Sequence, residues 1–210
     1  MNVIAAFLGR NGLKPNAATA LGVLMSAGGA FLIAMGHMLW AAVLITFAGL
    51  FDSLDGRIAR LQSRDKGFGA LLDSSMDRYG DALFFTGVAY GFFCSRESGY
   101  FLLALSAMAG SFEVSYVRAR AEGLGVACRV GFWERGERMA VLIMGLLSGN
   151  LHLAVILLGT LTHVTAAKRM LTVWNVMRCG HKGGEPMNRK SIAYVVCMAA
   201  LAASHIWIRP

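Results

Sequence analysis

Charged residues are scarce in this sequence. They make up 15% of its 210 residues, whereas 56% are hydrophobic and the mean hydropathy is +0.56. A soluble domain carries about a quarter charged residues. Apolar runs of the roughly 17–25 residues that cross a bilayer recur along the whole chain. This composition excludes an ordinary soluble domain and favours a bundle of membrane helices.

Zinc-binding and disulfide patterns are also missing. The four cysteines show no C-x-x-C spacing and the five histidines form no H-x-x-x-H pair, so we expect reduced thiols and no zinc site. No proline stands between Pro15 and Pro186, so the apolar segments lack the breaks typical of transporter ion paths. A cleavable signal peptide is not evident, and we predict a short interfacial helix at residues 1–12.

The apolar segments predict an all-α, polytopic transmembrane bundle of six core spans with a further apolar helix near the C-terminus. The predicted spans are 17–37, 39–60, 70–94, 99–121, 136–149, 151–177 and 191–208. Residues 1–178 form the predicted membrane domain, and 179–210 form a basic inner segment followed by the last apolar helix. Whether 191–208 crosses the membrane or lies at its surface stays open.

The positive charge is distributed unevenly over the loops. With odd-numbered spans running outward, all 20 Lys and Arg except Arg96 and Arg209 fall on one side. The positive-inside rule makes that side cytoplasmic, so we predict a protein of the cytoplasmic membrane with its active site facing the cytoplasm. The net charge of +8 therefore reflects topology and anionic ligands, and it needs no nucleic acid.

Acidic residues gather at the inner ends of the second and third spans, together with small residues. In each of the two spans, helical spacing puts the acidic and small residues on one face. The first set is Asp52, Asp55, Gly56 and Ala59, and the second is Gly69, Asp73 and Asp77. A short inner loop makes these spans antiparallel neighbours, so the two faces can meet. Carboxylates without His or Cys suit Mg²⁺ or Mn²⁺, and two such ions would neutralise a diphosphate. The alternative is a salt-bridge network with nearby arginines.

The pattern D-x2-D-G-x2-A-R-x8-G-x3-D-x3-D resembles the signature of the CDP-alcohol phosphotransferases over about residues 13–178. The fixed positions are Asp52, Asp55, Gly56, Ala59, Arg60, Gly69, Asp73 and Asp77. The resemblance implies a homodimer in which the four aspartates hold two metal ions and Asp77 is also the general base on the acceptor hydroxyl. It implies a CDP pocket, with CMP as the leaving group. That pocket would be lined by Asp52, Asp55, Gly56, Ala59, Arg60 and Gly69.

A second polar cluster covers residues 115–122 and 134–138. Its arginines favour an acceptor that already bears a phosphate. The segments S-Y-x-[KR]-A-R-A-E and E-R-x-E-R resemble those of phosphatidylinositol-phosphate synthases. The resemblance implies transfer from CDP-diacylglycerol or CDP-archaeol to inositol 1-phosphate. The implied phosphate ligands are Ser115, Arg118, Arg120 and Arg169, with Arg178 as a second candidate for the last.

Three alternatives remain at this point. The acceptor could be glycerol 3-phosphate or another polar alcohol, with the same chemistry. A membrane transporter or channel would use the aspartates as an ion path, although they lie towards one face of the membrane and not at its middle. A non-catalytic membrane protein leaves the four aspartates unexplained.

Overall fold

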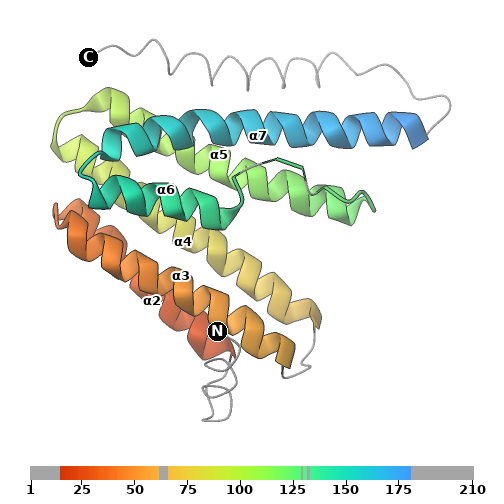
Figure 1. Ribbon diagram of the computed structural model, residues 1–210, viewed down its shortest axis with the longest axis horizontal. Helices are drawn as coiled ribbons and strands as arrows, with labels where there is room; N and C mark the ends of the chain where they lie inside the picture. The colour runs from red at the N-terminus through yellow and green to blue at the C-terminus, as the bar shows by residue number, and fades with distance from the viewer. Residues whose placement is uncertain (1–14, 62–65, 129, 132, 181–210) are drawn as a thin grey trace. The chain divides into compact units, whose positions relative to one another are not determined.

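The computed structural model of the chain describes residues 15–61, 66–128, 130–131 and 133–180. Over those residues the chain forms six α-helices and no strand (Figure 1). They are α2 (Pro15–Ala34), α3 (Met38–Leu61), α4 (Lys66–Cys94), α5 (Ser98–Gly123), α6 (Arg135–Leu147) and α7 (Leu151–Gly180). The predicted helices at 1–12 and 191–208 lie outside the described residues.

The six helices confirm the predicted all-helical fold and the order of its elements. Two polar helix ends extend three or four residues beyond the predicted spans, and α2 ends at Ala34, three residues before the predicted 37. Helix α4 begins at Lys66, ahead of the predicted residue 70, and α7 continues past residue 177 to Gly180. Hydropathy marks only the apolar part of a helix, whereas the backbone hydrogen bonds that define it continue through polar end turns.

Length and apolar composition identify fewer membrane spans than the six predicted. In the described part of the chain, two helices satisfy both criteria, Ser98–Gly123 with mean hydropathy 1.3 and Leu151–Arg178 with 1.4. The segments Ala20–Ala34 and Met38–Phe51 are apolar but shorter. Helix α6 has 13 residues and is therefore about 20 Å long, less than the roughly 30 Å of a hydrocarbon core. Length and hydropathy thus support two of the predicted spans in the described residues, and not the six core spans.

The chain divides into two compact units. Among the described residues, the first consists of those up to residue 96 together with 146–149, and the second of those from 97 to 145 and from 150 to 180. Among the described helices, α2, α3 and α4 belong to the first unit, and α5, α7 and most of α6 to the second. The signature aspartates therefore belong to the first unit and the arginine-rich cluster to the second.

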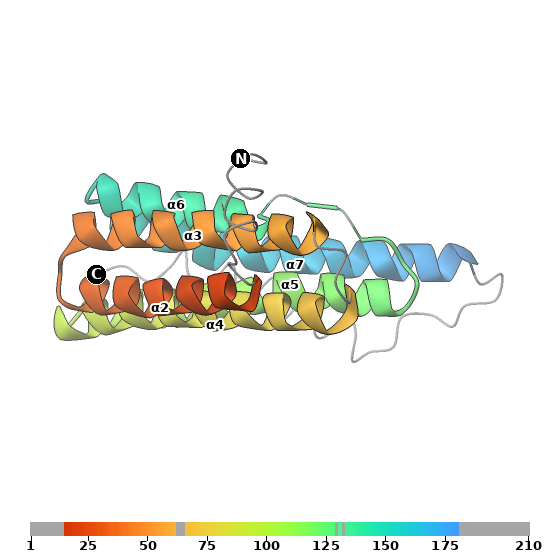
Figure 2. The same cartoon turned by 90° about the horizontal axis from the view of Figure 1, so that it is seen from below.

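Glycines allow α2 to pack closely against both α3 and α4. A Cβ added at Gly29 would lie 2.8 Å from Cγ1 of Ile45 on α3. A Cβ added at Gly87 on α4 would lie 2.6 Å from the carbonyl oxygen of Ala30 on α2. Figure 2 shows α2 and α3 as an antiparallel pair joined near Gly36, whose φ of +81° favours glycine. Small residues on the first predicted span thus serve close helix packing.

We expect Gly87→Ala to lower the free energy of unfolding by about 1–3 kcal/mol, the usual cost of overpacking. The obstacle is the backbone of Ala30, which cannot rotate away as a side chain would. Thermal unfolding in detergent measures the effect. Gly49→Ala is the matched control, because a Cβ there meets no atom of the described residues within 4 Å and alanine stabilises a helix by about 0.5–1 kcal/mol over glycine. Equal stability of Gly87→Ala and wild type would contradict this account.

In the second unit, α5 and α7 pack through a glycine and a buried histidine. A Cβ at Gly110 would overlap Oγ1 of Thr162. His163 is 3% exposed, and its Nε2 lies 3.0 Å from both the Oγ and the carbonyl oxygen of Ser106. This polar contact fixes the register of α5 and α7, two of the three helices that carry the arginine cluster.

Candidate active site

The signature occupies the last turns of α3 and the first turns of α4. Figure 1 shows these helices running in opposite directions, with the end of α3 and the start of α4 at the same end of the first unit. At 1.5 Å per residue, Asp55 stands about 9 Å before the end of α3 and Asp73 about 10 Å after the start of α4. The aspartates of the two helices therefore lie at similar distances from that end.

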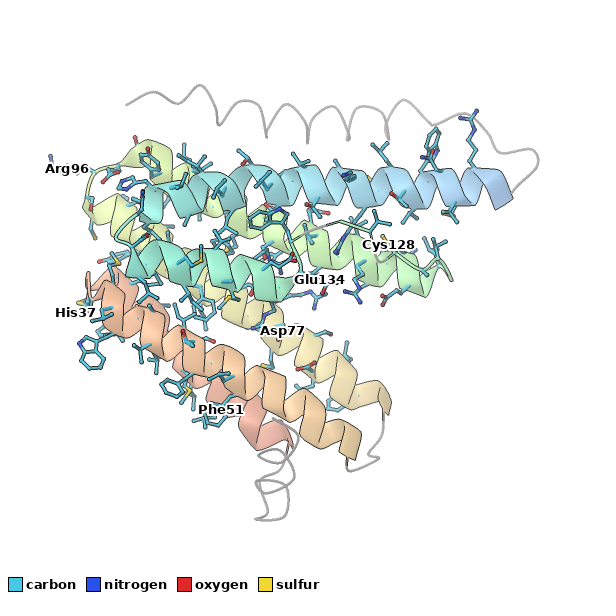
Figure 3. The ribbon with its side chains drawn as sticks, in the orientation of Figure 1. His37, Phe51, Asp77, Arg96, Cys128 and Glu134 are labelled. Atoms are coloured by element: carbon cyan, nitrogen blue, oxygen red, sulfur yellow. The ribbon has the colours of Figure 1, made fainter. Side chains whose placement is uncertain are left out.

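On α4, Asp73 and Asp77 lie one turn apart on one face, and both side chains are half-buried. Asp77 is labelled in Figure 3. Gly69 lies a further turn back on the same face and is exposed, and no atom of the described residues lies within 4 Å of an added Cβ. The neighbouring Arg78 donates a hydrogen bond to the carbonyl oxygen of Ser74 within the helix. The face thus combines two half-buried carboxylates with an exposed glycine.

On α3 the structure describes the backbone of the remaining signature residues but not their side chains. All of them fall within the helix, and they are Asp52, Asp55, Gly56, Ala59 and Arg60. Among the side chains that the structure describes, no group of three or more His, Cys, Asp or Glu could hold a metal ion. Since only two of the four signature carboxylates are in that set, the metal site stays a prediction.

In the second unit, the Arg118 side chain on α5 forms two ion pairs. Its Nε donates to Oε1 of Glu122 at 3.1 Å, and its Nη1 donates to Oε1 of Glu134 at 3.2 Å. Glu134, labelled in Figure 3, directly precedes α6. Partly exposed ion pairs of this kind contribute about 0–1 kcal/mol. An incoming phosphate can therefore displace either carboxylate from the Arg118 guanidinium at small cost.

A second guanidinium reaches α5 from α6. Arg138 is 4% exposed, its Nη1 donates to the carbonyl oxygen of Trp133 at 2.8 Å, and its Nη2 lies 3.5 Å from Oγ of Ser115. Ser115 and Arg118 share a face of α5, as their spacing predicts. Sequence reasoning omitted Arg138 from the phosphate ligands. Because α6 begins at Arg135, Arg138 projects from its first turn, and the E-R-x-E-R pattern was the available signal.

A helix cap fixes the residues just before α6. Oε2 of Glu137 accepts hydrogen bonds from the backbone N–H of Trp133 and, at 3.0 Å, of Glu134. A carboxylate in the first turn accepts hydrogen bonds from amide groups that have no partner within the helix. Its negative charge is also stabilised by the positive end of the helix dipole. The cap therefore holds both groups that the arginines contact, the Trp133 carbonyl and the Glu134 carboxylate.

The third guanidinium comes from α7 and is almost completely enclosed. Arg169 is 2% exposed, its Nε donates to the carbonyl oxygen of Val130 at 3.0 Å, and its Nη1 donates to that of Val114 at 2.8 Å. It also lies within electrostatic range of Arg118 and Arg138. The second unit thus gathers three cations beside one another.

The predicted acceptor ligands differ in their surroundings. Ser115, Arg118 and Arg169 belong to this cluster, whereas the Arg120 side chain is exposed on the last turn of α5. The second candidate, Arg178, is exposed near the end of α7, and its guanidinium carbon lies 5.2 Å from the centre of the Trp174 ring. The spacing of the arginines in the sequence does not reveal these contacts. The contacts indicate that the arginines have different roles.

Known proteins resemble the chain over most of its length. Residues 13–207 match the family model for CDP-alcohol phosphatidyltransferase. An archaetidylinositol phosphate synthase of Methanothermobacter thermautotrophicus is 37% identical over 166 residues, which cover 76% of this chain and 83% of that protein. A phosphatidylinositol phosphate synthase of Mycobacterium tuberculosis is 34% identical over 182 residues, which cover 81% of this chain and 84% of that protein.

Solved structures show the same fold. The crystal structure of the Mycobacterium tuberculosis phosphatidylinositol phosphate synthase with CDP-DAG bound matches with a TM-score of 0.76 at 34% identity, covering 82% of this chain and 92% of that chain. Its complex with manganese and citrate matches with a TM-score of 0.76 at 33% identity, covering 82% and 88%. These matches favour an enzyme over a membrane transporter or channel and over a non-catalytic membrane protein. The chain belongs to the CDP-alcohol phosphatidyltransferase family and is a transferase of phospholipid biosynthesis.

Proposed function

We propose that this enzyme transfers a phosphatidyl-type group from a CDP-linked lipid to inositol 1-phosphate and releases CMP. The observation that carries the acceptor assignment is the cluster of guanidinium groups around Ser115, with Arg118 and Arg138 on either side of the connection to α6. Guanidinium groups bind phosphate through paired N–H donors. The relatives named as inositol phosphate synthases support the same acceptor.

The donor set of the signature fits a hard divalent cation, Mg²⁺ or Mn²⁺. Asp73 and Asp77 present half-buried oxygens from one helix face, and the signature contains no His or Cys that would favour a softer metal. We propose that Asp52, Asp55, Asp73 and Asp77 hold two ions. When bound, the ions would neutralise the diphosphate of the donor. The manganese complex of the Mycobacterium tuberculosis enzyme supports this proposal.

Asp77 is the proposed general base. It removes the proton from the acceptor hydroxyl, whose oxygen then bonds to the phosphorus that carries the lipid. The bond from that phosphorus to the oxygen of CMP breaks, and CMP leaves with the electron pair. Arg60 stabilises the charge on the leaving phosphate. Small residues let the nucleotide approach the backbone, and these are Gly56, Ala59 and Gly69.

We assign the acceptor phosphate to Ser115, Arg118 and Arg120, and we add Arg138 because of its contact with Ser115. Arg118 can exchange its exposed carboxylate partners for phosphate, and Arg138 already points to the Ser115 hydroxyl. We do not assign Arg169 to the acceptor phosphate, because its two backbone hydrogen bonds favour a different role.

We propose that the six helices form a homodimeric domain in the cytoplasmic membrane, with the active site on the cytoplasmic side. Large apolar side chains are exposed along the helices, as contact with lipid requires. They include Leu24, Phe31, Trp40, Phe93 and Met144. The proposed donor lipid is CDP-diacylglycerol or CDP-archaeol. The signature residues do not distinguish between the two, because both present the same diphosphate to the protein.

A parallel transfer assay tests the proposed acceptor. The purified full chain is given CDP-diacylglycerol, a divalent cation and radiolabelled inositol 1-phosphate, free inositol, glycerol 3-phosphate or serine. We expect inositol 1-phosphate to be used at least about 100-fold better than free inositol, because the unphosphorylated alcohol leaves charged donors unpaired. Turnover with glycerol 3-phosphate alone would overturn the inositol assignment, and equal use of free inositol would overturn the phosphate subsite.

A further inference from the structure

We propose that Arg169 is a positioning residue that fastens the connection between α5 and α6, and that it acts on the acceptor through Arg118 and Arg138. The inference rests on the proposed function of that cluster. Arg169 is 2% exposed, so little of its guanidinium faces an incoming phosphate. Its Nε and Nη1 are already committed to the carbonyl oxygens of Val130 and Val114.

These two hydrogen bonds join three segments of the second unit. Val114 belongs to α5, Val130 to the connection at residues 124–134, and Arg169 to α7. Hydrogen bonds from a charged donor are stronger than those between neutral groups. The planar guanidinium donates along fixed directions, so one side chain sets the distance between the connection and both helices.

Gly131 gives an independent indication that the connection is held tightly here. Its φ of +102° lies in the region that favours glycine, and an added Cβ would lie 3.0 Å from Cγ2 of Thr165 and 3.9 Å from Nε of Arg169. The connection therefore approaches α7 more closely than a side chain would comfortably allow.

The fastened connection carries the two groups that orient the acceptor arginines. The Trp133 carbonyl accepts from Arg138, and the Glu134 carboxylate accepts from Arg118. If the connection moves away from α7, both partners move with it. Loss of Arg169 should therefore disturb the acceptor cluster without removing any phosphate ligand.

Hydrogen exchange and steady-state kinetics on the full-length enzyme test this role. In Arg169→Met we expect faster amide exchange in residues 124–134 of the substrate-free enzyme. We also expect the KM of the phosphorylated acceptor to rise about tenfold, the scale of one lost charged hydrogen bond, and the KM of the CDP-lipid to stay within about twofold of wild type. Lys168→Met removes an exposed neighbouring cation and should change none of these three quantities. Unchanged exchange in Arg169→Met would overturn the proposal.

A double-mutant cycle separates positioning from direct binding. Since Arg169 acts partly through Glu134, the effect of Arg169→Met on the acceptor KM should shrink in a Glu134→Gln background. Full additivity would identify Arg169 as a phosphate ligand and overturn the positioning role. Gly131→Ala loosens the same connection without changing charge and should raise the acceptor KM in the same way, and a wild-type KM in that variant also counts against the proposal. The exchange measurement needs no substrate, so it stands even if the acceptor proves to be glycerol 3-phosphate.

Discussion

Asp77→Asn is expected to lower kcat by about 10²–10⁴-fold, the contribution of a positioned general base. The amide has nearly the same shape as the carboxylate but cannot accept the proton of the acceptor hydroxyl, and it is a weaker ligand for a cation. Asp77 is half-buried on α4, so the substitution exchanges one polar group for another without opening a cavity. Radiolabelled transfer at saturating donor and acceptor measures the rate.

The matched control for this variant is Glu97→Gln, the same carboxylate-to-amide change outside the signature. Glu97 precedes α5, and its Oε2 lies 2.7 Å from Nε2 of His152. We expect the control to keep a kcat within about twofold of wild type, because substitutions at the protein surface usually change the stability by less than about 0.5 kcal/mol. Thermal unfolding of both variants shows whether the fold is intact. Full activity of a folded Asp77→Asn enzyme would rule out its role as base.

Removal of divalent cations should abolish transfer. We expect the rate in excess EDTA to fall by at least about 10³-fold, because the donor diphosphate then lacks several kcal/mol of charge neutralisation. Added Mg²⁺ or Mn²⁺ should restore the rate. Undiminished transfer in EDTA would disprove the metal requirement.

A binding measurement separates loss of metal from loss of fold. A ligand that binds only the native state stabilises it by about 2.7 kcal/mol at 100 times its Kd, so the melting temperature of the wild type should rise with Mn²⁺ concentration. The rise should be smaller in Asp73→Asn, which removes one proposed ligand from α4. The Glu97→Gln control should respond as the wild type does.

The sequence by itself was sufficient for the helices and for the reaction class. Long apolar runs predict helices in a bilayer because backbone polar groups must be satisfied within each segment. Helical spacing alone puts Asp73 and Asp77 on one face, and the structure confirms it. The prediction of spans was less reliable, because polar residues extend α4 and α7 beyond their apolar parts.

Only the tertiary structure distinguished the arginines from one another. Arg118, Arg138 and Arg169 look alike in the sequence, yet one is paired with exposed carboxylates, one reaches Ser115, and one is enclosed between backbone carbonyls. Their partners lie up to 55 positions away along the chain. Local spacing specifies which side chains share a helix face, whereas burial and hydrogen-bond partners depend on how helices pack. For this reason the sequence determined the reaction class, and the packing of α5, α6 and α7 decided the burial and the hydrogen-bond partners of each arginine.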